Sequence, residues 1–236
     1  MFPTAPNDEK IATCSVERTG MIQPAPLSNL KKVFFGNRVF DVIRFLDVLI
    51  SAIALIFFSP FFLFIALLIK CSSKGAVIFS QQRVGKNGTD FTLYKFRTMH
   101  VDAASKRSIT IGRRDNRITS VGYFLRRFKL DELPQLYNVL KNDMSIVGPR
   151  PELRRYVNFY DNSQLEILLI KPGITDYASI LFRNENELLA MKADPEKYYI
   201  ENIIPIKIRL GKKYTNDKNL KNYFGIIFKT VMIIFI

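Results

Sequence analysis

The uncharged run from Val48 to Ile69 constrains this chain most, because 22 residues without a charge have to be buried in a core or in a membrane. In a helix that rises about 1.5 Å per residue, such a run would be roughly 33 Å long, enough to cross the hydrocarbon core of a bilayer. Ser59 and Pro60 lie at its centre. Proline has no N–H to donate and its ring crowds the preceding turn, so we expect a break between two helical halves at this pair.

The charges around this run favour a hairpin that enters and leaves the same side of a membrane. Both flanks are basic, with Lys31, Lys32, Arg38 and Arg44 before the run and Lys70, Lys74, Arg83 and Lys86 after it. Basic flanks prefer the cytoplasm, so both ends prefer one side. A re-entrant helix-break-helix over residues 39–71 satisfies this preference. The alternative is an ordinary transmembrane helix with a proline kink. The run begins too late and is too long for a signal peptide.

A strongly basic composition points to anionic partners. The 35 Lys and Arg against 21 Asp and Glu give a net charge of +14, which suits nucleic acid, an anionic membrane face or a phosphorylated substrate. We expect no nucleic acid partner, because the chain has no zinc pattern, no aromatic–glycine RNA motif and no convincing helix-turn-helix spacing. A phosphorylated substrate at a membrane surface fits the charge and the apolar run together.

Cysteine and histidine are too few for a soft metal site. The chain has two cysteines, Cys14 and Cys71, and one histidine, His100, so neither a disulfide scaffold nor a zinc site is expected. Any metal would be a hard cation, Mg²⁺ or Mn²⁺, held by carboxylate and phosphate oxygens.

The fold class predicted for the rest of the chain is mainly α with a small β-hairpin. Residues 1–38 hold four prolines and no sustained period, so we expect an irregular N-terminal extension. Short runs of β-branched and aromatic residues at Ala76–Gln82 and Asp90–Phe96 flank the turn signal Gly85-Lys86-Asn87-Gly88, a pattern typical of a hairpin.

Helical patterns dominate after the hairpin. They are predicted at Ile118–Lys129, Glu132–Leu140, Glu152–Tyr160, Gln164–Leu169 and Asn184–Met191. A further helix start is predicted at Asp194-Pro195-Glu196, where Asp194 is the N-cap and Pro195 the first helical residue. The apolar C-terminal run Tyr223–Ile236 is too short to span a membrane, so we expect an interfacial or a core helix.

Asp131 and Glu132 are the candidate catalytic pair. A structural role for Asp131 is helix N-cap, before the predicted helix that contains Pro134 in its first turn. That role is compatible with catalysis, because a helix N-terminus keeps a carboxylate ionised and an ionised carboxylate can attack a phosphorus atom. Glu132 could activate a second oxygen or help Asp131 to hold a metal.

Four basic residues are candidates for binding phosphate: Arg126, Arg150, Lys95 and Arg97. Arg126 precedes Asp131 by five residues, close enough to share one phosphate. Arg150 stands between two prolines that stiffen its turn, and the planar fork of arginine matches phosphate oxygens. Lys95 and Arg97 end a predicted strand. Each of these side chains, taken alone, could instead be a solvated charge.

In these residues the chain resembles the bacterial sugar transferase family, the monotopic polyprenyl-phosphate phosphoglycosyl transferases. The similarity covers roughly residues 39–236, and its motifs are Ser59-Pro60, Phe79-Ser80-Gln81-Gln82-Arg83-Val84-Gly85, Lys95-Phe96-Arg97-Thr98-Met99, Arg117-Ile118-Thr119, Leu130-Asp131-Glu132-Leu133-Pro134-Gln135, Asp143-Met144-Ser145-Ile146-Val147-Gly148-Pro149-Arg150-Pro151 and Lys171-Pro172-Gly173-Ile174-Thr175. So many matches in order are far more specific than any single one.

The resemblance implies transfer of a sugar 1-phosphate from a UDP-sugar to undecaprenyl phosphate, with release of UMP, as the first membrane step of a surface glycan such as O-antigen, capsule or exopolysaccharide. It implies Mg²⁺ as the cofactor and Asp131 as a nucleophile that forms a covalent phosphosugar intermediate in a ping-pong sequence. Glu132 would lie beside the metal or the acceptor phosphate, and Arg126 would hold phosphate.

The same resemblance implies a monotopic membrane protein. Ser59-Pro60 would break a re-entrant helix, and residues 72–236 would form a cytosolic catalytic domain at the cytoplasmic face of the bacterial inner membrane. We expect a small version, without the multi-span N-terminal domain of larger relatives.

Three departures from the usual family pattern stand out. Lys129 replaces a small hydroxyl residue, and Asn142 replaces a glycine. The stretch from Asp176 to Glu185 differs from the commoner Gly-Trp-Ala-Gln version, which we interpret as a subgroup mark at the sugar or nucleotide pocket.

A second hypothesis is a non-catalytic membrane scaffold in a polysaccharide assembly complex, against which the joint presence of Asp131, Glu132 and Arg126 weighs. The sequence leaves open which sugar is moved, which glycan is built, and whether the chain forms a homo-oligomer.

Overall fold

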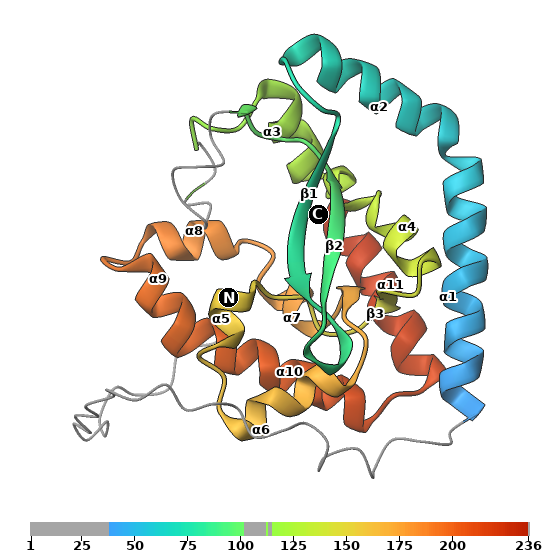
Figure 1. The fold of residues 1–236 in the computed structure, drawn as a ribbon, viewed down its shortest axis with the longest axis vertical. Helices are drawn as coiled ribbons and strands as arrows, with labels where there is room; N and C mark the ends of the chain where they lie inside the picture. Colours follow the sequence, from blue (N-terminus) through green and yellow to red (C-terminus); the bar gives the residue numbers. More distant parts are fainter. Residues whose placement is uncertain (1–37, 102–111, 113–114, 236) are drawn as a thin grey trace.

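The computed structural model describes residues 38–101, 112 and 115–235. The predicted extension over residues 1–38 therefore lies outside the described residues, except for Arg38. The described part is mostly helical with a small antiparallel hairpin, as predicted (Figure 1).

The predicted break at Ser59-Pro60 is confirmed. Helix α1 (Arg38–Phe57) and helix α2 (Ser59–Ser72) meet there, and their axes differ by 63°. Since Pro60 has no N–H to donate to the Ile56 carbonyl, the Ser59 hydroxyl donates to it instead, at 2.8 Å. By length and composition, none of the described helices could cross a membrane alone, but the bent α1–α2 pair could.

The two helices turn an apolar surface outward. Phe45, Ile53, Ile56 and Phe57 of α1 are exposed, and so are Leu63, Phe64 and Leu67 of α2. The inner faces pack against the rest of the protein through Ile43 and Asp47 of α1 and Ile65 and Ile69 of α2. An exposed apolar surface of this extent is typical of a membrane or protein contact.

The predicted β-hairpin is confirmed. Strand β1 (Ile78–Val84) pairs antiparallel with β2 (Asp90–Phe96), from Ile78 opposite Phe96 to Val84 opposite Asp90. The first strand begins and ends two residues later than predicted, because the chain reverses only at Lys86–Gly88, where Asn87 adopts a left-handed conformation (φ 57°).

A second pair of strands was not predicted. Strands β3 (Ser145–Val147) and β4 (Gly173–Thr175) are parallel and only three residues long, too short for an alternating pattern to show. The backbones touch just beyond them, since a Cβ on Gly173 would lie 2.1 Å from the Gly148 nitrogen. This contact fixes the loop that follows Gly148 against the loop before β4.

The remaining helices confirm most of the predicted ones in shortened form. They are α3 (Ser120–Arg127), the 3₁₀ turn η4 (Leu130–Glu132), α4 (Gln135–Leu140), α5 (Arg154–Val157), α6 (Asn162–Leu165), η5 (Glu166–Leu169), α7 (Tyr177–Leu181), α8 (Glu185–Ala190), α9 (Pro195–Tyr198), the π-helical turn η6 (Tyr199–Ile203), α10 (Ile204–Asn216) and α11 (Leu220–Phe235). Asp194 caps α9 as predicted, accepting from the Lys197 N–H. Helix α7 and helix α10, which leads to α11, were not predicted.

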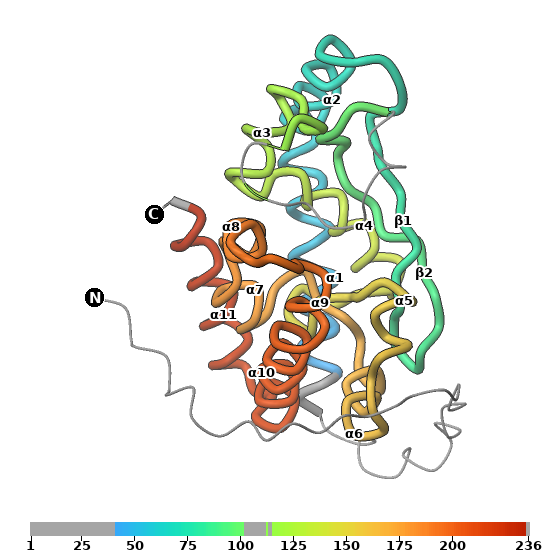
Figure 2. Tube along the Cα trace, turned by 90° about the vertical axis from the view of Figure 1, so that its left-hand side faces the viewer, coloured from blue at the N-terminus to red at the C-terminus, as the bar shows by residue number. Residues whose placement is uncertain are grey.

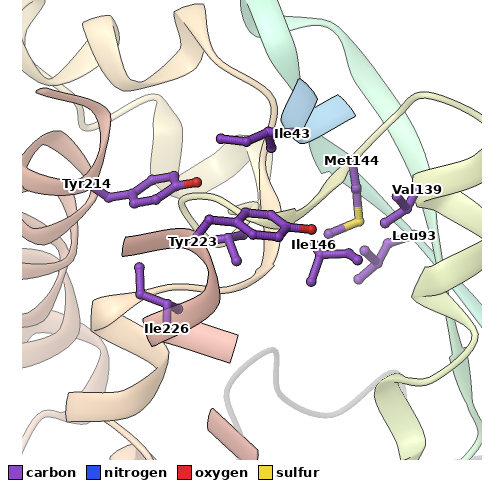
Figure 3. Close-up of a cluster of buried hydrophobic side chains, with 9 residues drawn as sticks. Ile43, Leu93, Val139, Met144, Ile146, Tyr214, Tyr223 and Ile226 are labelled. Carbon is purple, nitrogen blue, oxygen red and sulfur yellow. The ribbon is translucent and has the colours of Figure 1, made fainter. Parts of the chain in front are cut away.

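The largest core cluster joins elements from both ends of the chain (Figure 3). Ile43 of α1, Leu93 of β2 and Val139 of α4 meet Tyr223 and Ile226 of α11 there. Figure 2 shows α11 and the β1–β2 hairpin on opposite sides of the molecule, with α1 and α4 between them. The C-terminal helix therefore packs on the core through one face, while its other face, which includes Phe224, Phe228, Val231 and Met232, is exposed.

Candidate active site

Asp131 and Glu132 lie in η4, between α3 and α4. Lys129 ends α3 in a left-handed conformation (φ 56°), and the chain then turns through 3₁₀ hydrogen bonds, from the Glu132 N–H to the Lys129 carbonyl and from the Leu133 N–H to the Leu130 carbonyl. The predicted role of Asp131 as a helix N-cap is therefore wrong. Helix α4 begins after Pro134 without a side-chain cap, because backbone carbonyls already satisfy these N–H groups.

Glu132 is held by two cations. Both oxygens of its carboxylate accept from the Arg150 guanidinium, Nη1 to Oε2 at 3.1 Å and Nη2 to Oε1. The Lys95 ammonium, from β2, donates to Oε1 at 3.2 Å. Burial alone would raise the pKa of Glu132, but Arg150 and Lys95 outweigh it and hold that pKa well below its ordinary value.

Asp131 is as deeply buried as Glu132 but lacks such partners. Each residue is 8% exposed, and among the described residues no group donates to the Asp131 Oδ1 atom. Burial and the neighbouring Glu132 raise the pKa of Asp131, against the opposing charges of Lys95, Lys129 and Arg126. The two carboxylates thus differ: cations hold Glu132 in place, whereas Asp131 has an oxygen that is available to a ligand.

Besides Lys95, a further basic group, Arg126, lies beside this pair. Burial lowers the pKa of Lys95 to about 8, against the attraction of Glu132. Arg126, on α3, donates from Nε to the Thr98 hydroxyl at 2.8 Å. Burial also lowers the pKa of Arg126, and Asp131 is the strongest charge that opposes this shift. Asp131, Glu132, Lys95, Arg150 and Arg126 therefore form one electrostatic site.

Arg97 has a different position. Its Nη2 atom donates to the Ser73 carbonyl at 2.8 Å and to the Ser73 hydroxyl at 3.0 Å. A Cβ on Gly75 would lie 2.3 Å from the Arg97 Nη1 atom, so the chain passes this guanidinium closely. Arg97 thus ties the end of β2 to the end of α2, and so joins the bent helix pair to the site.

A second cluster of charged groups lies beside Arg150 and was missed in the sequence. The Glu152 carboxylate accepts from the Tyr199 hydroxyl at 2.5 Å. The Lys207 ammonium donates to that hydroxyl at 3.0 Å and lies 2.6 Å from the Glu185 carboxylate. Arg83, which does fall in a family motif, donates to the Pro151 carbonyl at 3.2 Å. Tyr199 and Lys207 fall in no motif, so only the packing of α10 could reveal them.

The donor set fits a hard cation only together with a phosphate. Among the described residues, no three acidic, histidine or cysteine side chains lie close enough to hold a metal by themselves. Mg²⁺ is commonly held by one or two carboxylates with substrate phosphates and water. The Asp131 carboxylate suits that role better than Glu132, whose oxygens already face two cations.

Sequence comparison finds a family and named relatives. The model of the bacterial sugar transferase family matches residues 38–236. The chain is 39% identical over 164 residues to UDP-N-acetylgalactosamine-undecaprenyl-phosphate N-acetylgalactosaminephosphotransferase of Aeromonas hydrophila, covering 67% of this chain and 39% of that protein. It is 39% identical over 157 residues to the exopolysaccharide production protein ExoY of Rhizobium meliloti, covering 60% and 70%.

A third relative carries a different sugar in its name. The chain is 42% identical over 157 residues to UDP-glucose:undecaprenyl-phosphate glucose-1-phosphate transferase of Klebsiella pneumoniae, covering 65% of this chain and 33% of that protein. The match thus spans about two fifths of the Aeromonas protein and a third of the Klebsiella protein, but most of ExoY.

Proposed function

The chain belongs to the bacterial sugar transferase family, and from this premise we propose that it transfers a sugar 1-phosphate from a UDP-sugar to undecaprenyl phosphate and releases UMP. The product is an undecaprenyl-diphosphate-sugar, the first membrane-bound intermediate of a surface glycan. The observation that carries this proposal is the unequal pair in η4, with Glu132 fixed by Arg150 and Lys95 and Asp131 left with an unpartnered oxygen.

In the first step, the Asp131 carboxylate attacks the β-phosphorus of the UDP-sugar. An O–P bond forms between Asp131 and that phosphorus, and the bond from the β-phosphorus to the bridging oxygen breaks. UMP leaves with the electron pair, and the sugar phosphate stays on Asp131. Since no group among the described residues donates to the Asp131 Oδ1 atom, no protein donor has to be displaced from this oxygen before it attacks.

In the second step, a phosphate oxygen of undecaprenyl phosphate attacks the same phosphorus. The bond between Asp131 and phosphorus breaks, the carboxylate is regenerated, and the diphosphate-linked lipid sugar is released. The enzyme therefore holds the two anionic substrates in turn, which is a ping-pong sequence.

The cations of the site have separate roles in this scheme. Arg126 and Lys95 offset the negative charge that gathers on the transferring phosphoryl group. Arg150 holds Glu132 in place through its fork and leaves Asp131 to react. When bound, Mg²⁺ would neutralise diphosphate oxygens, with Asp131 as its protein ligand.

The bent helix pair supports a place at the membrane. We infer that α1 and α2 form a re-entrant hairpin in the cytoplasmic leaflet of the inner membrane, since their outer faces are apolar and their flanks basic. The exposed apolar face of α11 would lie at the same interface. Tags at residue 1 and residue 236 should both be on the cytoplasmic side, and tags on opposite sides would refute the hairpin.

The experiment that tests the activity is a UMP-release assay with a panel of UDP-sugars and undecaprenyl phosphate. At least one UDP-sugar should give UMP and a lipid-linked diphosphate sugar with the wild type. Asp161→Asn is the matched control for Asp131→Asn and should keep the activity, because Asp161 is an exposed helix cap far from η4 in sequence. Release of UDP in place of UMP would contradict the proposal and indicate an ordinary glycosyl transfer. Retained glycan production in cells that carry Asp131→Asn would favour the scaffold hypothesis.

A further inference from the structure

A small cavity lies beside Arg150, on the side of the second charged cluster. Its volume is about 30 Å³. One water needs about 10–15 Å³ measured in the same way, so the cavity has room for two or three waters or for one small chemical group. A whole hexose ring is too large for it.

One part of the cavity lining, the polar wall, consists of largely buried charged side chains. Asp176, Glu152 and Lys207 line it next to Arg150. Asp176 is 1% exposed, and its Oδ1 atom accepts from the Ser179 N–H, so the carboxylate is fixed at the start of α7. This wall therefore presents the carboxylates of Asp176 and Glu152 and the ammonium of Lys207. Glu152 already accepts from the Tyr199 hydroxyl, and Lys207 already donates to that hydroxyl and pairs with Glu185, so a ligand would use their remaining hydrogen-bonding positions.

A second part of the lining, the apolar wall, consists of Ile167, Leu168, Ile170 and Ile208, which come from η5, the segment after it and α10. A ligand with only hydroxyl groups would leave this wall without an apolar partner. A hydrocarbon group would instead leave the charged wall without hydrogen bonds, which costs free energy in a buried site.

We propose that this cavity receives the acetamido group of an N-acetylhexosamine donor, a choice of substrate class that rests on the proposed function. The amide N–H can donate to a carboxylate of the polar wall, the amide carbonyl can accept from Lys207, and the methyl group can pack against the isoleucines and Leu168. The sugar ring stays outside the cavity, next to Arg150, so that the phosphate attached to the ring reaches Asp131 and Glu132.

The names of the relatives do not decide this point, because one names N-acetylgalactosamine and another names glucose at similar identity. Asp176 begins the stretch that departs from the commoner family pattern. The Asp176 carboxylate gives the cavity wall a fixed hydrogen-bond acceptor where the commoner family pattern has a glycine.

The test compares donors that differ only in this group. UMP release is measured with UDP-N-acetylgalactosamine against UDP-galactose, and with UDP-N-acetylglucosamine against UDP-glucose. In at least one pair, kcat/KM should favour the acetamido donor by about 10–100-fold, the range that one extra group in a pocket can give. Equal kcat/KM values, or a preference for the hydroxyl donor in both pairs, would overturn the inference while the proposed function stands.

Variants of the cavity wall test the location. Leu168→Phe should fill the cavity and lower kcat/KM for the acetamido donor about tenfold, with little change for the hydroxyl donor. Leu168→Met keeps the volume and should keep the preference. If Leu168→Phe lowers both donors equally at an unchanged melting temperature, the acetamido group does not enter this cavity.

A variant of the polar wall gives an independent check. Lys207→Met should reduce the preference for the acetamido donor. Lys212→Met is the control and should not reduce it, because the Lys212 ammonium of the wild type pairs with Glu166 outside the cavity. An unchanged preference in folded Lys207→Met would remove Lys207 from the inference. If no UDP-sugar gives UMP or an enzyme adduct, the proposed function itself fails, and this inference fails with it.

Discussion

Two buried aspartates in different regions of the molecule have opposite surroundings. Asp47, in the core between α1, β3 and α11, is 2% exposed. Its carboxylate accepts from the Ser145 hydroxyl at 2.7 Å, the Ile146 N–H at 3.0 Å and the Tyr223 hydroxyl at 2.9 Å. Asp131, in η4, is 8% exposed, and its Oδ1 atom has no donor among the described residues.

The difference separates a structural carboxylate from a reactive one. A buried carboxylate whose oxygens accept several hydrogen bonds stabilises the fold, and removal of it leaves donors unpaired. A buried carboxylate with an unpartnered oxygen destabilises the fold and is retained where a ligand completes it. Asp47 thus joins segments about a hundred residues or more apart in sequence, whereas Asp131 has the surroundings of the nucleophile that we propose it to be.

The largest effect is expected from Asp131→Asn. Because an amide is a poor nucleophile, turnover should fall by about 10³-fold or more, as for other catalytic groups of this kind. At neutral pH the variant should also unfold at a temperature a few degrees higher, because it removes a buried charge. Steady-state kinetics and thermal unfolding in detergent measure both. A large loss of stability would make Asp131 a structural residue like Asp47.

The next effect is expected from Asp47→Ala. The variant leaves three buried donors without partners, the Ser145 hydroxyl, the Ile146 N–H and the Tyr223 hydroxyl. At about 1–3 kcal/mol for each unpaired group, this costs about 3 kcal/mol or more. Turnover per folded molecule should stay close to that of the wild type. Asp41→Ala, an exposed site on the same helix, is the control and should change stability little. If Asp47→Ala is as stable as Asp41→Ala, Asp47 does not have the structural role that its three hydrogen bonds indicate.

A smaller effect is expected from Arg150→Lys. Lysine keeps the charge but cannot bind both oxygens of Glu132, so kcat/KM should fall by about 10–100-fold, which is about 1–3 kcal/mol. The same exchange at Arg154, whose ion pair with Asp90 is exposed, should have almost no effect. An equal loss of kcat/KM in Arg150→Lys and Arg154→Lys would show that the two hydrogen bonds from Arg150 to Glu132 do not contribute to activity.

The smallest effect concerns pH. The pKa of Asp131 is raised in the folded state, so its contribution to stability is present below its ordinary pKa of 3.8 and is lost as pH rises through the raised pKa. The gain in melting temperature of Asp131→Asn over the wild type should therefore be largest near neutral pH and shrink as pH falls toward 4. A gain in melting temperature that is the same at every pH would show that Asp131 is not a buried carboxylate with an unpartnered oxygen.

Local signals in the sequence predicted more of the fold than of the site. Pro60 fixes the break between α1 and α2, and Asn87 and Gly88 fix the turn of the hairpin, because backbone restrictions act within a few residues. The parallel pair β3–β4 could not be predicted, since its two strands are short and come from segments that only the fold brings together.

The site could be predicted as a set of residues but not as an arrangement. Asp131, Glu132, Lys95, Arg126 and Arg150 do converge, but the predicted capping role of Asp131 failed because the left-handed Lys129 starts a 3₁₀ turn. The attachment of Arg97 to Ser73 and the three partners of Asp47 depend on contacts between distant segments, for which one sequence carries no local signal.

The most direct test of the account is an intact-mass measurement of the purified protein after incubation with a UDP-sugar and no undecaprenyl phosphate. We expect a mass gain of one sugar phosphate, release of one equivalent of UMP, an adduct on the peptide that carries Asp131, and no adduct in Asp131→Asn. Release of UDP without any adduct, or an adduct that persists in Asp131→Asn, would contradict the account.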